Sequence, residues 1–204
     1  MPAKSFGPID LIYQLKITLR DSRPPIWRRV LVPGMFTLPK LHHVIQTAMG
    51  WSDGHLHRFL VDGIYYSAPI YPDRDREDTD DEDSRRITLG QIASLNRKFK
   101  YEYDFGDGWE HEIVVEKVLL PEPGAMYPQC VKGKGACPPE DVGGVGGYAN
   151  FLEAIRDPDH AEHQMYVEWI GGEFDPTAFD LAATNQALQR VKPKVKRRAS
   201  ARGG

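Results

Sequence analysis

The chain has 204 residues and a formal net charge of −3. Hydrophobic residues make up 41% of it and charged residues 27%, which favours a globular protein with one sizeable core over a disordered chain. No apolar run approaches the roughly 20 residues of a membrane span. The N-terminus also lacks the apolar region of a signal peptide. We therefore expect a cytoplasmic protein without a membrane segment.

The net charge hides a difference between the last residues and the rest of the chain. Residues 192–204 contain six basic and no acidic residues, so residues 1–191 carry a net charge of −9. This composition predicts a disordered basic tail that could contact nucleic acid. The alternative is a solvated tail without a partner. The residues proposed for a nucleic-acid contact are Lys192, Lys194, Lys196, Arg197 and Arg198.

The first part of the chain has the patterns of strands around one helix. Apolar residues alternate over 11–19, which predicts a strand, and a second strand is expected over 26–32. Leu38, Leu41, Ile45 and Met49 follow the period of a helix that Thr37 can cap and Gly50 can end. Residues 55–61 and 64–67 flank Asp-Gly, a strong signal for a two-residue hairpin.

The remainder begins with an acidic loop over 72–86 and a short helix over 87–95. A second hairpin is expected from residue 99 to about 120, and the Pro- and Gly-rich stretch 121–147 should be irregular. Helices are expected over 148–155, 159–170 and 177–191. Strands therefore dominate the first 120 residues and helices the rest, which predicts one α+β domain with antiparallel strands.

The second hairpin carries the densest set of aromatic and titratable residues, over 101–111. Matching apolar faces across the hairpin predicts that Phe105 pairs with Trp109 and Tyr103 with His111. His111 would then lie among aromatic residues, as a general base or metal ligand at a pocket edge or as a hydrogen-bonded core histidine. Asp104 would face away from it, and Asp107 would project from the turn.

His55 and His57 are two residues apart in a predicted strand, so both side chains share a face and could bind a divalent metal ion. A half-buried strand with polar ends explains the pattern equally well. A metal site needs further ligands, and Asp104 is the first candidate. The remaining candidate ligands or catalytic groups are His111, Asp107, Glu140 and Asp141.

Two other features carry weaker hypotheses. His160 and His163 could share one face of a helix and bind one ion, although a solvated face explains them as well. The glycines of residues 133–147 precede a predicted helix but lack the Gly-Lys-Ser/Thr of a phosphate-binding loop.

Several stretches in order resemble the plasmid pRi ORF-three-like family, whose members are also labelled TnpR-type passenger proteins of insertion sequences. The resemblance covers roughly residues 9–190 and implies an α+β fold, while no biochemical activity is established for the family. The TnpR label implies a link to mobile elements. The matching stretches are 25–29 (PIWRR), 41–51 (LHHVIQTAMGW), 55–59 (HLHRF), 101–111 (YEYDFGDGWEH), 138–144 (PPEDVGG), Gly147-Tyr148, 174–176 (FDP), Phe179-Asp180 and Asn185.

Three functions remain open from the sequence. The first is a binding or accessory module that contacts nucleic acid or a mobile-element protein through the basic tail. The second is a metal-assisted hydrolase or other enzyme, in which Trp51, Trp109 and Tyr103 form the pocket wall. The third is a protein-interaction domain whose partner binds an aromatic cleft near Trp27, Trp51 and Trp109.

Overall fold

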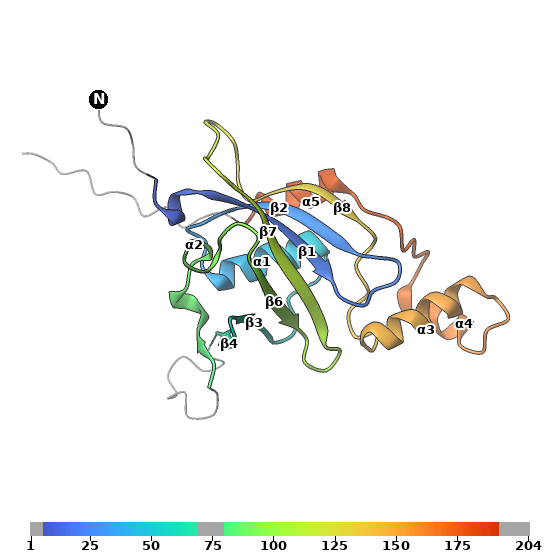
Figure 1. The fold of residues 1–204 in the computed structure, drawn as a ribbon. Helices are drawn as coiled ribbons and strands as arrows, with labels where there is room; N and C mark the ends of the chain where they lie inside the picture. Colours follow the sequence, from blue (N-terminus) through green and yellow to red (C-terminus); the bar gives the residue numbers. More distant parts are fainter. Residues whose placement is uncertain (1–5, 69–79, 192–204) are drawn as a thin grey trace, which may run out of the picture.

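The computed structural model describes residues 6–68 and 80–191. Within these residues the chain forms one sheet of eight strands in the order β5-β4-β3-β6-β7-β1-β2-β8 (Figure 1). All neighbouring strands are antiparallel except β4 and β5. The strands are β1 (Ile12–Leu19), β2 (Trp27–Pro33), β3 (His57–Val61), β4 (Ile64–Ser67), β5 (Glu82–Asp83), β6 (Lys98–Tyr103), β7 (Trp109–Leu119) and β8 (Gln129–Lys134).

Five α-helices accompany the sheet in the described part of the chain, together with short 3-10 turns at Pro8–Asp10 and Ser84–Arg86. Figure 1 shows α1 lying across one face of the sheet, while α3 and α4 project together from one side of the molecule. This arrangement confirms the predicted α+β class. The helices are α1 (Leu38–Met49), α2 (Leu89–Ile92), α3 (Gly144–Arg156), α4 (His163–Ile170) and α5 (Leu181–Leu188).

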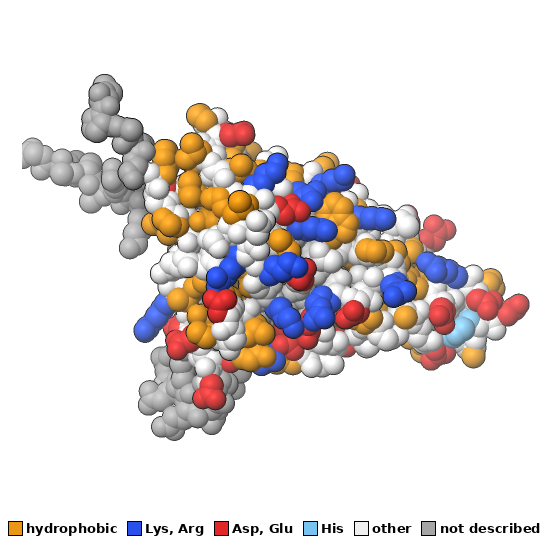
Figure 2. All heavy atoms as spheres, viewed as in Figure 1, with side chains coloured by type: hydrophobic (Ala, Val, Ile, Leu, Met, Phe, Trp, Pro, Cys, Tyr) orange, Lys and Arg blue, Asp and Glu red, His pale blue; other side chains and the backbone are white. Residues whose placement is uncertain are grey.

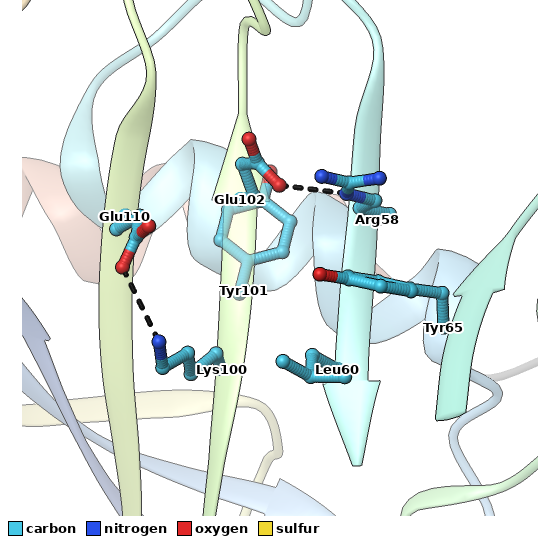
Figure 3. Close-up of a pocket in the computed structure, with 7 residues that line it drawn as sticks. All are labelled: Arg58, Leu60, Tyr65, Lys100, Tyr101, Glu102 and Glu110. Atoms are coloured by element: carbon cyan, nitrogen blue, oxygen red, sulfur yellow. Dashed lines mark hydrogen bonds and ion pairs between the residues drawn. The ribbon is translucent and has the colours of Figure 1, made fainter. Parts of the chain in front are cut away.

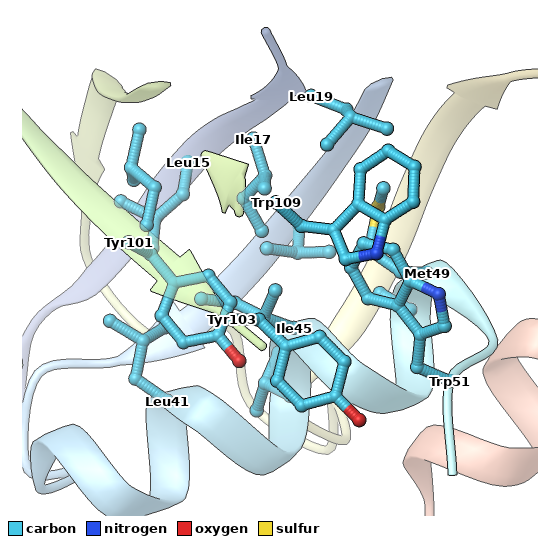
Figure 4. Packing of buried hydrophobic residues seen from close by; sticks show 14 of the residues in the cluster. Leu15, Ile17, Leu19, Leu41, Ile45, Met49, Trp51, Tyr101, Tyr103 and Trp109 are labelled. Atoms are coloured by element: carbon cyan, nitrogen blue, oxygen red, sulfur yellow. The ribbon is translucent and has the colours of Figure 1, made fainter. Parts of the chain in front are cut away.

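The hydrophobic core fills the space between α1 and the sheet (Figure 4). Alternate residues of β1, including Leu15 and Ile17, are fully buried, as a strand with one covered face requires. Leu41 and Ile45 supply the facing stripe of α1. The predicted alternation in the first strand and the apolar stripe of the first long helix are therefore confirmed.

Both ends of α1 follow local chemistry. Thr37 occupies the predicted N-cap position without a side-chain hydrogen bond, and the first helical N–H, from Leu38, donates to the Ile87 carbonyl instead. Gly50 ends the helix in the left-handed region with φ 113°, where glycine carries no Cβ penalty. The chain therefore leaves α1 at Gly50 and enters the loop that begins at Trp51.

The predicted register of the second hairpin is wrong by two residues. Tyr103 pairs with Trp109 and Tyr101 with His111, whereas the sequence pattern favoured Phe105 opposite Trp109. The strand ends because Asp104 adopts a left-handed conformation with φ 54°. Its carboxylate also accepts a hydrogen bond from the Gly106 N–H at 2.9 Å. A shift of two residues keeps every side chain on its face, so only the turn changes, and Phe105 is 47% exposed.

The region predicted to be irregular contains an edge strand, β8, which pairs with β2. Its free edge is covered by α5, because Asn185 donates to the Cys130 carbonyl at 2.9 Å and accepts from the Cys130 N–H at 2.8 Å. Asp180 caps α5 by accepting from the Ala183 N–H at 2.9 Å. The C-terminal helix therefore protects the edge of the sheet against pairing with another chain.

Several predicted boundaries differ from the structure. The hairpin at Asp62-Gly63 is confirmed, since Val61 pairs directly with Ile64. The short helix predicted over 87–95 is limited to α2, and the strand predicted to begin at residue 55 begins at 57. The later helices begin at 144, 163 and 181 rather than at 148, 159 and 177. Residues 72–79 of the predicted acidic loop and the predicted basic tail, 192–204, lie outside the described residues.

Candidate functional site

A loop of residues 51–56 joins α1 to β3 and holds a distant segment against the sheet. The Trp51 Nε1–H donates to the Pro138 carbonyl at 3.0 Å. The Ser52 N–H and hydroxyl donate to Glu140 Oε1 at 2.8 and 3.0 Å. Because each contact joins residues far apart in the chain, the position of Glu140 depends on the tertiary fold.

The turn of residues 104–108 docks on Gly143 and Gly144 at the start of α3. The Gly143 N–H donates to Asp107 Oδ2 at 3.2 Å. Gly144 has φ 67°, and a Cβ at this position would lie only 2.3 Å from the Asp107 carbonyl oxygen. Asp107, a predicted functional carboxylate, therefore fastens the turn to the segment that carries Glu140 and Asp141. The glycines are needed because they allow the backbones to approach.

These two contacts bring His55 among three carboxylates, a group that we call the His55 cluster (His55, Asp104, Glu140 and Asp141). Asp141 Oδ1 lies 3.3 Å from His55 Nε2, and Glu140 Oε2 lies 3.9 Å from the same nitrogen. The other ring nitrogen, Nδ1, is 3.6 Å from Asp104 Oδ2. One ligand atom from each of His55, Asp104 and Asp141 lies within 4.8 Å of the other two.

The spacing within the His55 cluster is longer than ordinary hydrogen bonds, whose N···O distances are about 2.7–3.2 Å. It is close to the separation of two ligands on one ion, since tetrahedral ligands about 2.0–2.2 Å from zinc lie roughly 3.4 Å apart. An imidazole binds one ion through one nitrogen, and Nε2 is the nitrogen that faces two carboxylates. Asp104 faces Nδ1. Many metal-binding histidines are oriented in this way, by a carboxylate that contacts the ring nitrogen not bound to the metal.

The carboxylates of the His55 cluster differ in how firmly they are held. Glu140 is fixed through Oε1 by Ser52 and receives a further bond from the Tyr103 hydroxyl at 3.2 Å. Asp104 is buried, whereas the Asp141 side chain is 71% exposed. Three carboxylates beside one imidazole create a negative potential that a cation would relieve.

A second group of ligand-type side chains lies at the other end of the same loop, and we call it the His42 cluster (His42, His43 and Asp53). The sequence pattern did not single out these residues. His42 Nε2 lies 2.5 Å from Asp53 Oδ1, and His43 Nδ1 lies 3.1 Å from Asp53 Oδ2. Adjacent histidines near the start of a predicted helix were the available signal, but the apolar stripe that predicts the helix does not include them.

His57, a predicted metal ligand, belongs to neither cluster among the described residues. Its ring stacks on His42, with 3.4 Å between ring centroids and 4° between ring planes. Two parallel rings cannot both direct in-plane lone pairs at one ion, so His57 acts as a packing partner of His42. Burial lowers the pKa of both rings to about 3, which keeps the stack neutral.

His111 is a core histidine. It is fully buried, and its Nδ1 is 3.1 Å from the Trp109 carbonyl, to which it donates in the neutral form. Burial lowers its pKa to about 4. Of the two readings of His111 left open by the sequence, the structure therefore supports the core residue.

The predicted aromatic pocket wall is part of the core. Trp51 and Trp109 are buried with ring centroids 5.8 Å apart, so the predicted aromatic cleft near Trp27, Trp51 and Trp109 is wrong. Tyr103 is also buried, but its hydroxyl reaches Glu140. Burial and the nearby Glu140 carboxylate raise the pKa of Tyr103, which keeps the hydroxyl protonated.

Of the described residues, those on the outer face of the sheet form no comparable group of metal-ligand side chains. Figure 2 shows basic and acidic side chains interspersed on this face. A depression of about 520 Å³ lies over Gln14, Arg29 and Glu116, whose side chains are hydrogen-bonded to one another. A smaller depression, of about 100 Å³, lies between β3, β4, β6 and β7 (Figure 3), less than the roughly 300 Å³ of the smallest typical ligand pockets. Its charged groups are paired, with Arg58 donating to Glu102 at 2.6 Å.

The predicted helical pair of His160 and His163 is wrong. His160 precedes α4, which begins at His163, and its Nδ1 accepts from the Glu162 N–H at 3.1 Å. His163 Nδ1 is 2.8 Å from the Ala154 carbonyl. Each ring therefore fixes the connection between α3 and α4.

Within the described residues, no helix combines the length and apolar character needed to cross a membrane.

Comparisons with known proteins identify the family of this chain. The model of the plasmid pRiA4b ORF-3-like protein family matches residues 11–183. An uncharacterized protein of Sinorhizobium fredii, y4hQ, is 40% identical over 192 residues, covering 92% of this chain and 96% of its own length. The crystal structure of MM3350, a protein of unknown function from Methanosarcina mazei Go1, has a TM-score of 0.76 and 37% identity, covering 84% of this chain and 96% of that one. The chain belongs to the plasmid pRiA4b ORF-3-like protein family.

Proposed function

We propose that the His55 cluster binds a divalent metal ion and that this ion catalyses a hydrolysis by activating a bound water molecule or by polarising a bound substrate. The observation that carries the proposal is that His55 Nε2 faces Asp141 at 3.3 Å and Glu140 at 3.9 Å without a hydrogen bond to either. These residues come from segments that only the fold brings together. A cation among them would replace repulsion between carboxylates with direct coordination.

Each residue has a separate role in this proposal. His55 Nε2, Glu140 Oε2 and Asp141 Oδ1 are the metal ligands, and Asp104 orients the imidazole through Nδ1. Glu140 remains anchored because Ser52 and Tyr103 bind its other oxygen. Three protein ligands leave coordination positions open, as in catalytic zinc sites.

The exposure of the His55 cluster supports hydrolysis over a purely structural role. Asp141 is largely exposed, and the His55 side chain is 32% exposed, so solvent can reach the ion. A bound divalent ion lowers the pKa of a coordinated water and polarises a carbonyl or phosphoryl oxygen. One imidazole and two carboxylates suit Mn²⁺ or Zn²⁺.

Isothermal titration of chelator-treated full-length protein with Mn²⁺ tests the proposal. We expect one Mn²⁺ site in the unaltered protein and no measurable site in His55→Ala. His160→Ala is the matched control, because this histidine lies outside the cluster and should leave Mn²⁺ binding unchanged. Absence of binding, or equal binding by His55→Ala, would refute the proposed metal site.

A nucleic-acid contact through the basic tail is a second proposal, supported by the six basic residues of 192–204. The net charge of −9 on the rest of the chain disfavours contact elsewhere. The link to mobile elements implied by the family resemblance stays a prediction.

A further inference from the structure

We infer that the His42 cluster is a second metal site, one that prefers Zn²⁺ to Mn²⁺. It provides two imidazole nitrogens and one carboxylate within reach of a single ion. Two histidines with one carboxylate form a common ligand set for zinc, and nitrogen ligands favour Zn²⁺ over Mn²⁺. This inference rests on residues separate from the ligands of the His55 cluster.

The positions of the ligand atoms carry the inference. His42 and His43 are neighbours on α1, and their ring centroids are 5.1 Å apart with 50° between the ring planes. Each presents one nitrogen to a different oxygen of Asp53, at 2.5 and 3.1 Å. A modest opening of the shorter contact would admit an ion between the three side chains.

Surrounding residues hold these groups in place before any ion binds. The Tyr101 oxygen lies 2.7 Å from His42 Nδ1 and accepts from the Gln46 side-chain N–H at 2.9 Å. Gln46 also binds the Asp53 backbone, because its Oε1 accepts from the Asp53 N–H at 3.2 Å. One glutamine thus holds both the Tyr101 hydroxyl that contacts His42 and the backbone of Asp53, as residues around the ligands do in known metal sites.

The protonation state of His42 is compatible with metal binding. Burial keeps the ring neutral, so one nitrogen carries a hydrogen and the other a lone pair. Without an ion, the Tyr101 hydroxyl donates to Nδ1 and Nε2–H donates to Asp53. A phenol can also accept a hydrogen bond, so the ring hydrogen can reside on Nδ1 when Nε2 binds an ion.

Access to the His42 cluster comes from the exposed side of α1. The side chains of His43 and Asp53 are 54% and 35% exposed, whereas His42 is almost completely buried. His43 also lines a surface groove with Met35, Phe36 and Lys40. A fourth coordination position on the side of His43 and Asp53 would therefore face solvent.

Crossed metal titrations of chelator-treated full-length protein test the inference. We expect His43→Ala to weaken one Zn²⁺ site at least tenfold and to leave Mn²⁺ binding unchanged. We expect Asp141→Asn to remove Mn²⁺ binding and to preserve the Zn²⁺ site that needs His43. His160→Ala serves as the control for loss of a histidine outside both clusters.

Visible absorption of bound Co²⁺ gives an independent measurement, since nitrogen ligands change its spectrum. The Asp141→Asn variant should keep the absorption bands of Co²⁺ bound at the His42 cluster. The same bands should be absent from the spectrum of the His43→Ala variant. An unchanged Zn²⁺ isotherm in His43→Ala would overturn the second site, as would Zn²⁺ binding that depends only on Asp141. If Mn²⁺ fails to bind while the His43-dependent Zn²⁺ site persists, the proposed function fails and this inference stands.

Discussion

The His55 and His42 clusters lie at opposite ends of one short loop, yet their histidines have different surroundings. Asp53 reaches His42 from only 11 positions away, and both oxygens of its carboxylate are close to imidazole nitrogens. His55 meets Glu140 and Asp141 from a remote segment, at longer distances of 3.9 and 3.3 Å. Local sequence assembles one cluster, and docking of a distant glycine-rich segment assembles the other.

The contrast separates two ways of placing ligand-type side chains. In the His42 cluster, Tyr101 and Gln46 already provide hydrogen bonds around a buried, neutral ring. In the His55 cluster, three carboxylates surround one imidazole, so the side chains favour binding of a cation more strongly. We therefore expect changes in the remote segment to affect the His55 cluster alone.

The largest effect should follow from Gly144→Ala. The new Cβ would lie 2.3 Å from the Asp107 carbonyl oxygen at a position with φ 67°, so the segment carrying Glu140 and Asp141 must move. We expect titration to show loss of Mn²⁺ binding with retention of the His43-dependent Zn²⁺ site. Gly146→Ala is the matched control, because nothing lies within 4 Å of its added Cβ. Full Mn²⁺ binding by Gly144→Ala would show that the docked segment supplies no ligands.

Asp104→Asn should have the next largest effect. The amide can keep the hydrogen bond from Gly106 through Oδ1, but it replaces the carboxylate oxygen that faces His55 Nδ1. Loss of such an orienting carboxylate lowers metal affinity by about 10–100-fold. Mn²⁺ titration measures the change, and Glu102→Gln on the same hairpin provides the control. Equal affinity in both variants would remove Asp104 from the proposed role.

His111 is a fully buried core histidine, whereas the histidines of the two clusters lie beside carboxylates. The unfolded chain takes up a proton at this residue near pH 6.5, whereas burial lowers the folded-state pKa to about 4. Its contribution to stability is therefore complete above pH 6.5 and is lost as the pH falls toward 4. Between pH 7 and pH 5 this loss is about 2 kcal/mol.

Denaturant unfolding of His111→Asn at pH 7 and pH 5 measures this contribution. The free energy of unfolding should fall by about 2 kcal/mol less in the variant than in the unaltered protein, because the variant cannot bind that proton. His160→Asn, changed at a histidine outside the core, should retain the full pH dependence. An identical fall in all three proteins would contradict a neutral His111.

The smallest effect on both clusters should come from removing residues 192–204. We expect metal binding and the free energy of unfolding to remain unchanged, while affinity for nucleic acid at low salt falls at least about tenfold. Fluorescence anisotropy over a range of salt concentrations measures this change. The truncated protein should also show a shallower salt dependence. Equal binding by the full-length and truncated chains would exclude the tail as the contact.

Local patterns predicted much of the fold. Alternation at Leu15 and Ile17 revealed β1, and the apolar spacing at Leu41 and Ile45 revealed α1. The sequence pattern did not predict the edge strand β8, because its residues are rich in glycine and lysine and its pairing with β2 depends on a distant partner. The predicted hairpin register was wrong because the chain leaves the strand at Asp104 through a local turn, which matching of apolar faces does not detect.

Residue types nominated parts of the candidate site, and tertiary contacts decided how they group. The sequence by itself determined the α+β class, the faces of the main strands and the presence of His55, Glu140 and Asp141 as ligand-type residues. Only the folded chain separated His57 into a stack with His42, buried His111 in the core and brought Glu140 to His55. The physical reason is that periodicity reflects burial along one element, whereas a site depends on distances between elements that long-range packing sets.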